Sequence, residues 1–183
     1  MGLDMYLSAK LYVGGWNHNR HPAFDKIVAA VGITPDEGSP CFHVDANVGY
    51  WRKANAVHAW FVRHVQDGID ECQRVSVDRK QLEQLRAACQ EVLASVETVE
   101  GKVADGSTHY ADGRVEYHSR DGAVIAQPAV AARVLPTQGG FFFGKTDYDE
   151  DYLADLRDTV AIVDRVLNAP EMADCSFEYH ASW

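Results

Sequence analysis

A pattern of apolar and polar positions near the middle of the chain, residues 49–67, predicts an amphipathic helix. Its apolar side chains recur at steps of three and four residues: Ala54, Val57, Phe61 and Val65. A second row beside that stripe contains Trp51, Asn55 and His58, since residues three and four apart are neighbours on a helix. We therefore expect a buried helix face bordered by a polar and aromatic row.

Similar spacing predicts three further helices. The first begins at Pro22, which suits the first turn of a helix, and ends at Gly32. The second begins after Asp78, because Gln81 three residues later completes a capping box. The third covers residues 147–168, where acidic side chains in the first turn complement the helix dipole.

Alternating patterns predict strands at both ends of the chain. Residues 3–13 and 175–183 alternate between apolar and polar side chains. Three consecutive phenylalanines between glycines, Phe141 to Phe143, predict a central strand buried on both faces. Residues 41–48 and 75–77 are expected to add short extended segments. Because an unpaired terminal strand would not be ordered, we expect both end strands and the phenylalanine strand in one sheet.

Residues 99–134 have a different character. They contain three turn signals: Asp105-Gly106, Asp112-Gly113 and Asp121-Gly122. Asp-Gly pairs favour hairpin turns, so the segment is expected to be a hairpin or loop excursion. It is either a tolerated surface insertion, a mobile flap or a partner-contacting arm. The remainder, residues 1–98 and 135–183, is expected to form a single α+β domain, with about three or four helices on an antiparallel or mixed sheet.

The composition excludes some classes of function. The chain has 183 residues, with 17 Lys and Arg against 27 Asp and Glu and a formal net charge of −10. Non-specific nucleic-acid binding is therefore not expected, because the phosphate backbone would be repelled. No apolar stretch suits a membrane span and no secretory signal is recognised. We expect a soluble cytoplasmic protein with reduced thiols.

Segments from both ends and the centre of the chain resemble one family. These are GLDMYLSAKLYVGGW, VGYWRKANAVHAWFV, LPTQGGFFFG and FEYHASW. Together they are similar to small uncharacterised phage and prophage proteins. The resemblance implies a mobile-element accessory protein, a setting in which genes often act on host defence or metabolism, and it implies no particular reaction.

The row on the central helix is the candidate ligand site. Trp51 offers a stacking face, Asn55 an orienting amide and His58 an acid–base group. Arg52 and Lys53 suit a phosphate near the helix N-terminus, where backbone N–H groups also point. The same pattern is also typical of a structural helix with a packed tryptophan and buried hydrogen bonds, which is the commoner meaning of such stripes.

Other candidate chemistry has weaker support. Four side chains with metal-binding chemistry are His18, His21, His43 and Asp45. Their spacing is generic and requires two loops to meet, so we expect no metal. Residues 139–145 lack P-loop spacing, and no cofactor motif is recognised. The acidic run in residues 147–158 is interpreted as a solvated helix face, with imitation of a phosphate backbone as the alternative.

These observations lead to three hypotheses about function. The first is a binding module that holds a host protein or a small phosphorylated ligand and thereby counteracts a host defence system. The second is a hydrolase that acts on a phosphate-containing substrate, with His58 as acid–base group. The third is a structural or assembly role in a virion. A concave pocket at the central row would favour a ligand site, and a flat apolar or acidic patch a protein partner. The sequence leaves the oligomeric state open.

Overall fold

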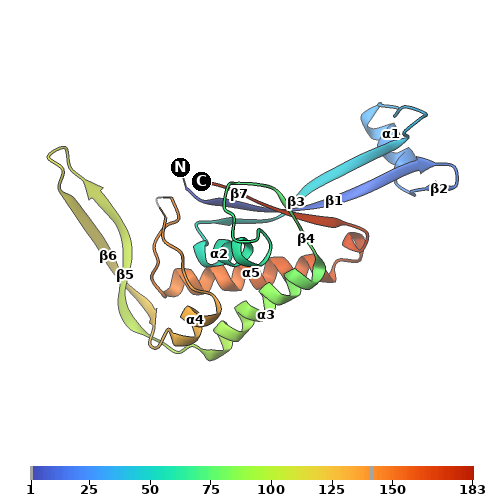
Figure 1. Cartoon of the computed structure of the whole chain (residues 1–183). Coiled ribbons are helices and arrows are strands. Elements are labelled where there is room, and N and C mark those ends of the chain that lie inside the picture. Colours follow the sequence, from blue (N-terminus) through green and yellow to red (C-terminus); the bar gives the residue numbers. More distant parts are fainter. Residues whose placement is uncertain (1, 141) are drawn as a thin grey trace.

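The computed structural model describes residues 2–140 and 142–183 and has the α+β fold predicted from the sequence (Figure 1). In chain order its elements are β1 (Asp4–Trp16), β2 (Asn19–Arg20), α1 (Phe24–Val31), β3 (Cys41–Arg52), α2 (Asn55–His64), β4 (Val75–Val77), α3 (Arg79–Ser95), β5 (Thr98–His109), β6 (Val115–Ile125), α4 (Ala129–Val134), α5 (Glu150–Asn168), the 3₁₀ helix η1 (Pro170–Met172) and β7 (Ser176–Ser182). Among the described residues, no helix combines the length and the apolar character that crossing a bilayer requires.

The main sheet is antiparallel and is organised around β1. Its described strands run in the order β2-β1-β7-β4, and β3 also pairs with β1. β3 follows β1 along residues 4–14, whereas β7 follows it only along residues 4–10. Both end strands therefore lie in one sheet, as their alternation predicted, and the two chain ends are neighbours in Figure 1. Past the end of β7, β1 and β3 continue as an arm with β2 and α1 at its tip (Figure 1).

The core forms where one face of the sheet meets the helices. Leu3, Met5 and Leu7 have no exposed surface, because alternate residues of an extended chain point to the same face. Helices α2, α3 and α5 lie on one side of the sheet (Figure 1). The ring of Phe61 in α2 stacks on that of Tyr179 in β7, with centroids 3.8 Å apart.

The predicted helix boundaries are confirmed where local capping decides them. The Asp78 side chain accepts from the backbone N–H of Gln81 at 2.7 Å, and the Gln81 side chain accepts from the N–H of Asp78 at 2.9 Å. This capping box satisfies two N–H groups at the start of α3. At the end of α1, Gly32 has a φ of 68°, a left-handed conformation that glycine adopts without strain.

The predicted central helix, residues 49–67, is wrong at its start. Trp51 and Arg52 belong to β3, where Trp51 lies opposite Met5 of β1. Lys53 then has a φ of 60°, which ends the strand, and α2 begins two residues later. Pairing with a strand far away in sequence therefore overrides the helical periodicity of this segment.

The predicted phenylalanine strand is wrong for Phe142 and Phe143, and Phe141 lies outside the described residues. The N–H of Phe143 donates to the carbonyl of Gly140 at 3.2 Å, which forms a turn. The carbonyl of Phe142 accepts from the N–H of Leu3 at 3.0 Å, and Phe143 is buried. Phe143 is therefore buried, as expected of the apolar run, and Phe142 is partly buried, but the chain reaches the core here through a loop.

Residues 99–134 contain one long hairpin followed by the short helix α4. Strands β5 and β6 form a two-stranded sheet of their own that projects from the body (Figure 1). Asp112-Gly113 lies in the hairpin turn, as expected. Asp105-Gly106 instead lies in a bulge, where the strand register shifts, and Asp121-Gly122 lies inside β6.

The base of this hairpin is part of the packed body. Val103 has no exposed surface, and the core includes Ile125 and Ala131. A Cβ on Gly122 would lie 3.0 Å from the Glu150 side chain at the start of α5, so the strand backbone approaches this helix closely. Only the outer part of the hairpin projects, and the boundaries of an inserted segment stay a prediction.

Candidate functional site

His58 is completely buried within a chain of hydrogen bonds. Its Nδ1 lies 2.7 Å from the Tyr179 hydroxyl, and its Nε2 lies 2.9 Å from Oδ2 of Asp70. The other oxygen of Asp70 accepts from Nε1 of Trp183 at 3.2 Å. Burial is the main cause that raises the pKa of Tyr179 well above its ordinary value. Both nitrogens of His58 are occupied by protein groups, so this network joins α2 to β7 and to the loop after α2.

Trp51 and Arg52 lie next to each other in β3 and have different surroundings. Trp51 is buried, and its Nε1 donates to Oγ1 of Thr159 in α5 at 2.9 Å. The Arg52 side chain is 59% exposed, and its Nη1 lies 3.9 Å from the Asp4 carboxylate. Because successive residues of a strand point to opposite faces, the end of β3 places the tryptophan in the core and the arginine in solvent.

Asn55 fastens a loop to the first turn of α2. Its Nδ2 donates to the carbonyls of Phe143 and Lys145, at 3.1 and 2.7 Å, and its Oδ1 accepts from the N–H of Gln138 at 3.0 Å. The side chain is buried, and its amide group is engaged on both sides. Asn55 therefore holds the loop that forms one wall of a cleft.

A cleft of about 620 Å³ lies between the N-terminal ends of α2 and α5 and the β5–β6 hairpin. Its lining includes Arg52 and Asn55 of the predicted site, but neither Trp51 nor His58. Most of its lining comes from the end of β3, residues 137–147 and the first turns of α5. Small-molecule sites have volumes of roughly 300–1,000 Å³, so the cleft is large enough for a ligand of that class.

Cationic and acidic side chains meet in this cleft. The Nζ of Lys145 lies 2.6 Å from carboxylate oxygens of both Asp149 and Asp151. Burial lowers the pKa of Lys145, but its hydrogen bonds to these two carboxylates raise it by more. Lys145 is thus neutralised within the protein. Arg52 and Lys53 remain as the cleft cations that no described carboxylate holds closely.

The start of α2 adds backbone donors near the same two cations. The cap position, Ala54, forms no side-chain cap. The N–H of Asn55 donates to the carbonyl of Lys53 at 2.8 Å, whereas the next N–H groups at the start of a helix have no partner within the helix. Ala56 of this first turn lines the cleft. A helix N-terminus favours an anion through these N–H groups and the helix dipole. The helix end, Arg52 and Lys53 therefore attract the same kind of ligand group.

Asp155 in α5 contributes a carboxyl group to the cleft. Burial, followed by the nearby carboxylates of Asp158, Asp151 and Asp149, raises the pKa of Asp155 to about 7. No described residue donates a hydrogen bond to this carboxyl. The interpretation of residues 147–158 as a solvated helix face is therefore wrong for Asp155. Asp149, which was expected in the first turn of this helix, is instead its cap residue.

The hairpin supplies the outer wall of the cleft. Its contribution includes Gly106 and Ser107 of β5 and Tyr117 of β6. Neither Tyr117 nor Asp155 was among the site residues expected from the sequence. Asp155 could have been found from its position four residues after Asp151, which places both on one helix face. No local signal identifies Tyr117, because its place depends on where the hairpin lies relative to α5.

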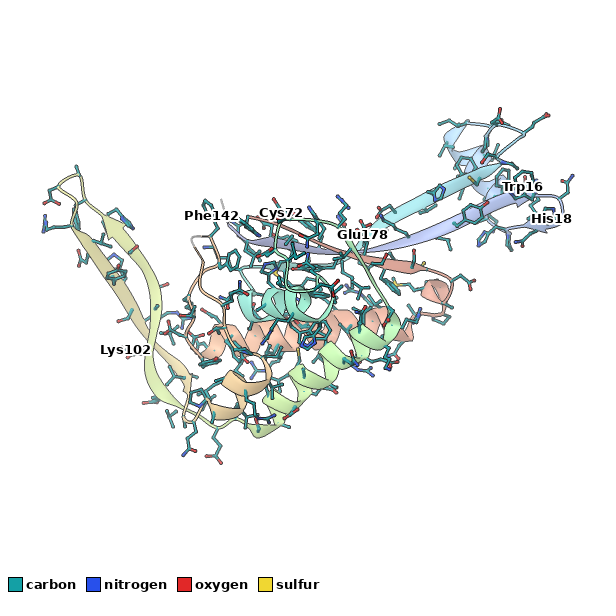
Figure 2. All side chains as sticks on the ribbon, viewed as in Figure 1. Trp16, His18, Cys72, Lys102, Phe142 and Glu178 are labelled. Atoms are coloured by element: carbon teal, nitrogen blue, oxygen red, sulfur yellow. The ribbon has the colours of Figure 1, made fainter. Side chains whose placement is uncertain are left out.

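The four candidate metal ligands have other surroundings. Nδ1 of His21 accepts from a backbone N–H at 3.1 Å, Nε2 of His43 lies 4.0 Å from Sγ of Cys41, and Asp45 lies 3.9 Å from a lysine. Figure 2 places His18 with Trp16 at the tip of the arm, on the opposite side of the molecule from Lys102 of the hairpin. Among residues 2–140 and 142–183, no group of three or more His, Cys, Asp or Glu side chains is placed to hold a metal ion.

The structure is an α+β protein with a cleft lined by both cationic and acidic side chains. Comparisons with known protein families, with curated proteins and with solved structures give no significant match. The resemblance to phage and prophage proteins therefore stays a prediction, and the function has to be inferred from the cleft.

Proposed function

We propose that this protein is a binding module that holds a small phosphorylated ligand in the cleft, as an accessory protein of a phage or prophage. The observation that carries the proposal is the corner of the cleft formed by Arg52, Lys53 and the uncapped start of α2. By removing such a ligand from the cell, the protein would counteract a host defence system. The mobile-element setting rests on the sequence resemblance alone.

The charge distribution supports a phosphate at this corner rather than elsewhere in the cleft. Lys145 is already neutralised by two carboxylates, whereas the guanidinium of Arg52 is more than half exposed. Guanidinium groups bind phosphate through paired N–H donors, and a helix N-terminus adds backbone N–H groups. A concave polar site also favours a ligand over a host protein, which would require a flat apolar or acidic surface.

The test is a calorimetric titration with ribose 5-phosphate as the probe. Binding is expected for the native protein and should weaken at least about tenfold in Arg52→Gln and in Lys53→Gln, since a charged hydrogen bond contributes roughly 1.5–3 kcal/mol. Lys26→Gln is the matched control, because Lys26 is exposed on α1 in the distant arm. Equal affinity in all three variants, or no binding by the native protein, would overturn the proposal.

A second candidate function is hydrolysis of a phosphate-containing substrate. Asp155 is better placed than His58 to act as the acid–base group, because it lines the cleft and has a pKa of about 7, whereas His58 is enclosed by protein groups. A group with this pKa transfers protons efficiently near neutral pH. Phosphate release from a phosphomonoester that disappears in Asp155→Asn would favour the hydrolase. If ³¹P NMR shows that the ester stays intact in the presence of the protein, the binding module is favoured.

A further inference from the structure

Tyr117 is an aromatic side chain that the fold leaves uncovered at the cleft. It is 82% exposed, and it lies near the start of β6, beside the β-bulge of β5, and lines the cleft wall. Tyr110 at the hairpin turn, in contrast, hydrogen-bonds Glu116 and lies under the guanidinium of Arg114. A tyrosine ring offers a flat face on which another ring can stack.

The β-bulge next to Tyr117 makes room for such a partner. Ser107 lies opposite Tyr117, and Ala104 lies opposite Ser119, so that Asp105 and Gly106 together face a single residue. Gly106 has a φ of 96°, which glycine adopts without the strain that a side chain would cause. Bulges often redirect side chains next to binding sites. The small residues of β5 in the cleft lining leave space beside the Tyr117 ring.

Asp155 lines the same cleft as Tyr117 from the body of the protein. It is partly buried, and its carboxyl has no hydrogen-bond donor among the described residues. Asp151 is occupied by Lys145 and lies 3.5 Å from Arg120, while Asp147 lines the cleft in an exposed position. N–H donors of a ligand would stabilise this partly buried carboxylate, since an unpaired polar group away from water costs free energy.

We infer that the cleft accepts a guanine nucleotide, with the base against Tyr117, its N–H edge toward Asp155 and its phosphate at Arg52 and Lys53. This inference rests on the proposed function and names the ligand class for the same site. Guanine presents two adjacent N–H donors, which match the two oxygens of one carboxylate. Uracil presents a single N–H between two carbonyl oxygens, which a carboxylate would repel. The net charge of −10 favours a mononucleotide over a polynucleotide.

The experiment compares guanosine 5′-monophosphate, uridine 5′-monophosphate and ribose 5-phosphate by calorimetry at pH 8. The guanine nucleotide is expected to bind at least tenfold more tightly than either of the others. Tyr117→Ala should reduce its affinity to that of ribose 5-phosphate, whereas Tyr117→Phe should keep it, because stacking needs the ring and not the hydroxyl. Tyr110→Ala is the control on the same hairpin, away from the cleft.

Asp155→Asn supplies an independent check on the base edge. It should weaken binding of the guanine nucleotide but not that of ribose 5-phosphate, which has no base, since an amide offers one acceptor where the carboxylate offers two. Equal affinities for the two nucleotides, or full affinity of Tyr117→Ala for guanosine 5′-monophosphate, would overturn the inference. If ribose 5-phosphate still binds in that case, the proposed function stands. Failure of all three probes would overturn both. Because Tyr117 is exposed, circular dichroism of its variants should match that of the native protein.

Discussion

Replacing His58 by alanine removes the centre of the network that joins Asp70, Tyr179 and α2. We expect this variant to lose stability through broken internal contacts, and not through any effect on a ligand. The imidazole lies outside the cleft lining and has no exposed surface. His58→Ala therefore separates the structural role of this residue from the catalytic role that the sequence suggested.

The size of the effect follows from the groups left behind. The Tyr179 hydroxyl would remain in a site with no exposed surface, and a buried polar group without a partner costs about 1–3 kcal/mol. The space left by the ring adds about 1–2 kcal/mol. The Asp70 side chain is 18% exposed and can be hydrated, so its contribution is small. The total is about 2–5 kcal/mol, out of the roughly 5–15 kcal/mol that stabilises a typical domain.

Urea denaturation followed by circular dichroism measures this loss. His64→Ala is the matched control, because His64 lies on the same helix and is exposed, so its loss should cost less than about 1 kcal/mol. Tyr179→Phe deletes only the hydroxyl and should lie between these two variants. If His58→Ala unfolds at the same urea concentration as His64→Ala, the network does not stabilise the fold and the structural interpretation fails.

Two further predictions concern the cleft. Because the folded-state pKa of Asp155 is raised from 3.8 to about 7, the favourable contribution of its protonated form is present below pH 4 and is lost as pH rises through 7. Asp155→Asn should therefore match the native protein near pH 4 and exceed its stability by about 1–3 kcal/mol at pH 8, as measured by melts across this range. Replacing residues 105–118 with a two-glycine turn should preserve cooperative unfolding, because loop shortening costs little and Val103 at the hairpin base is retained. A broad melt in that variant would place the outer hairpin in the core.

Helix ends and strands were predicted correctly from the sequence wherever neighbouring residues decide the structure. The capping box of Asp78 and Gln81, the glycine that ends α1 and the alternation of the end strands all act within a few residues. Trp51 follows a helical spacing, but its pairing with Met5 places it in a strand. Strand preference depends on the partner more than on the segment itself, so only the folded chain could correct this assignment.

For the same reason, the sequence could predict only part of the cleft lining. Arg52 and Asn55 are close in sequence and line the cleft together. Asp155 and Tyr117 come from α5 and from the outer hairpin, more distant in the chain, and no periodicity links them to Arg52. His58 has the chemistry of a catalytic group, but residue type alone does not distinguish a reactive histidine from one enclosed by a tyrosine and an aspartate.

The position of β7 between β1 and β4 has a consequence for synthesis on the ribosome. After β1 has left the exit tunnel, it must wait for residues 176–182 before its second edge is paired. Until then, the nascent chain exposes unpaired strand edges, which attract other chains. Contacts this distant in sequence also slow folding. A nascent chain halted before β7 should therefore bind chaperones that shield extended segments, and the chaperones should be released only when β7 has been translated.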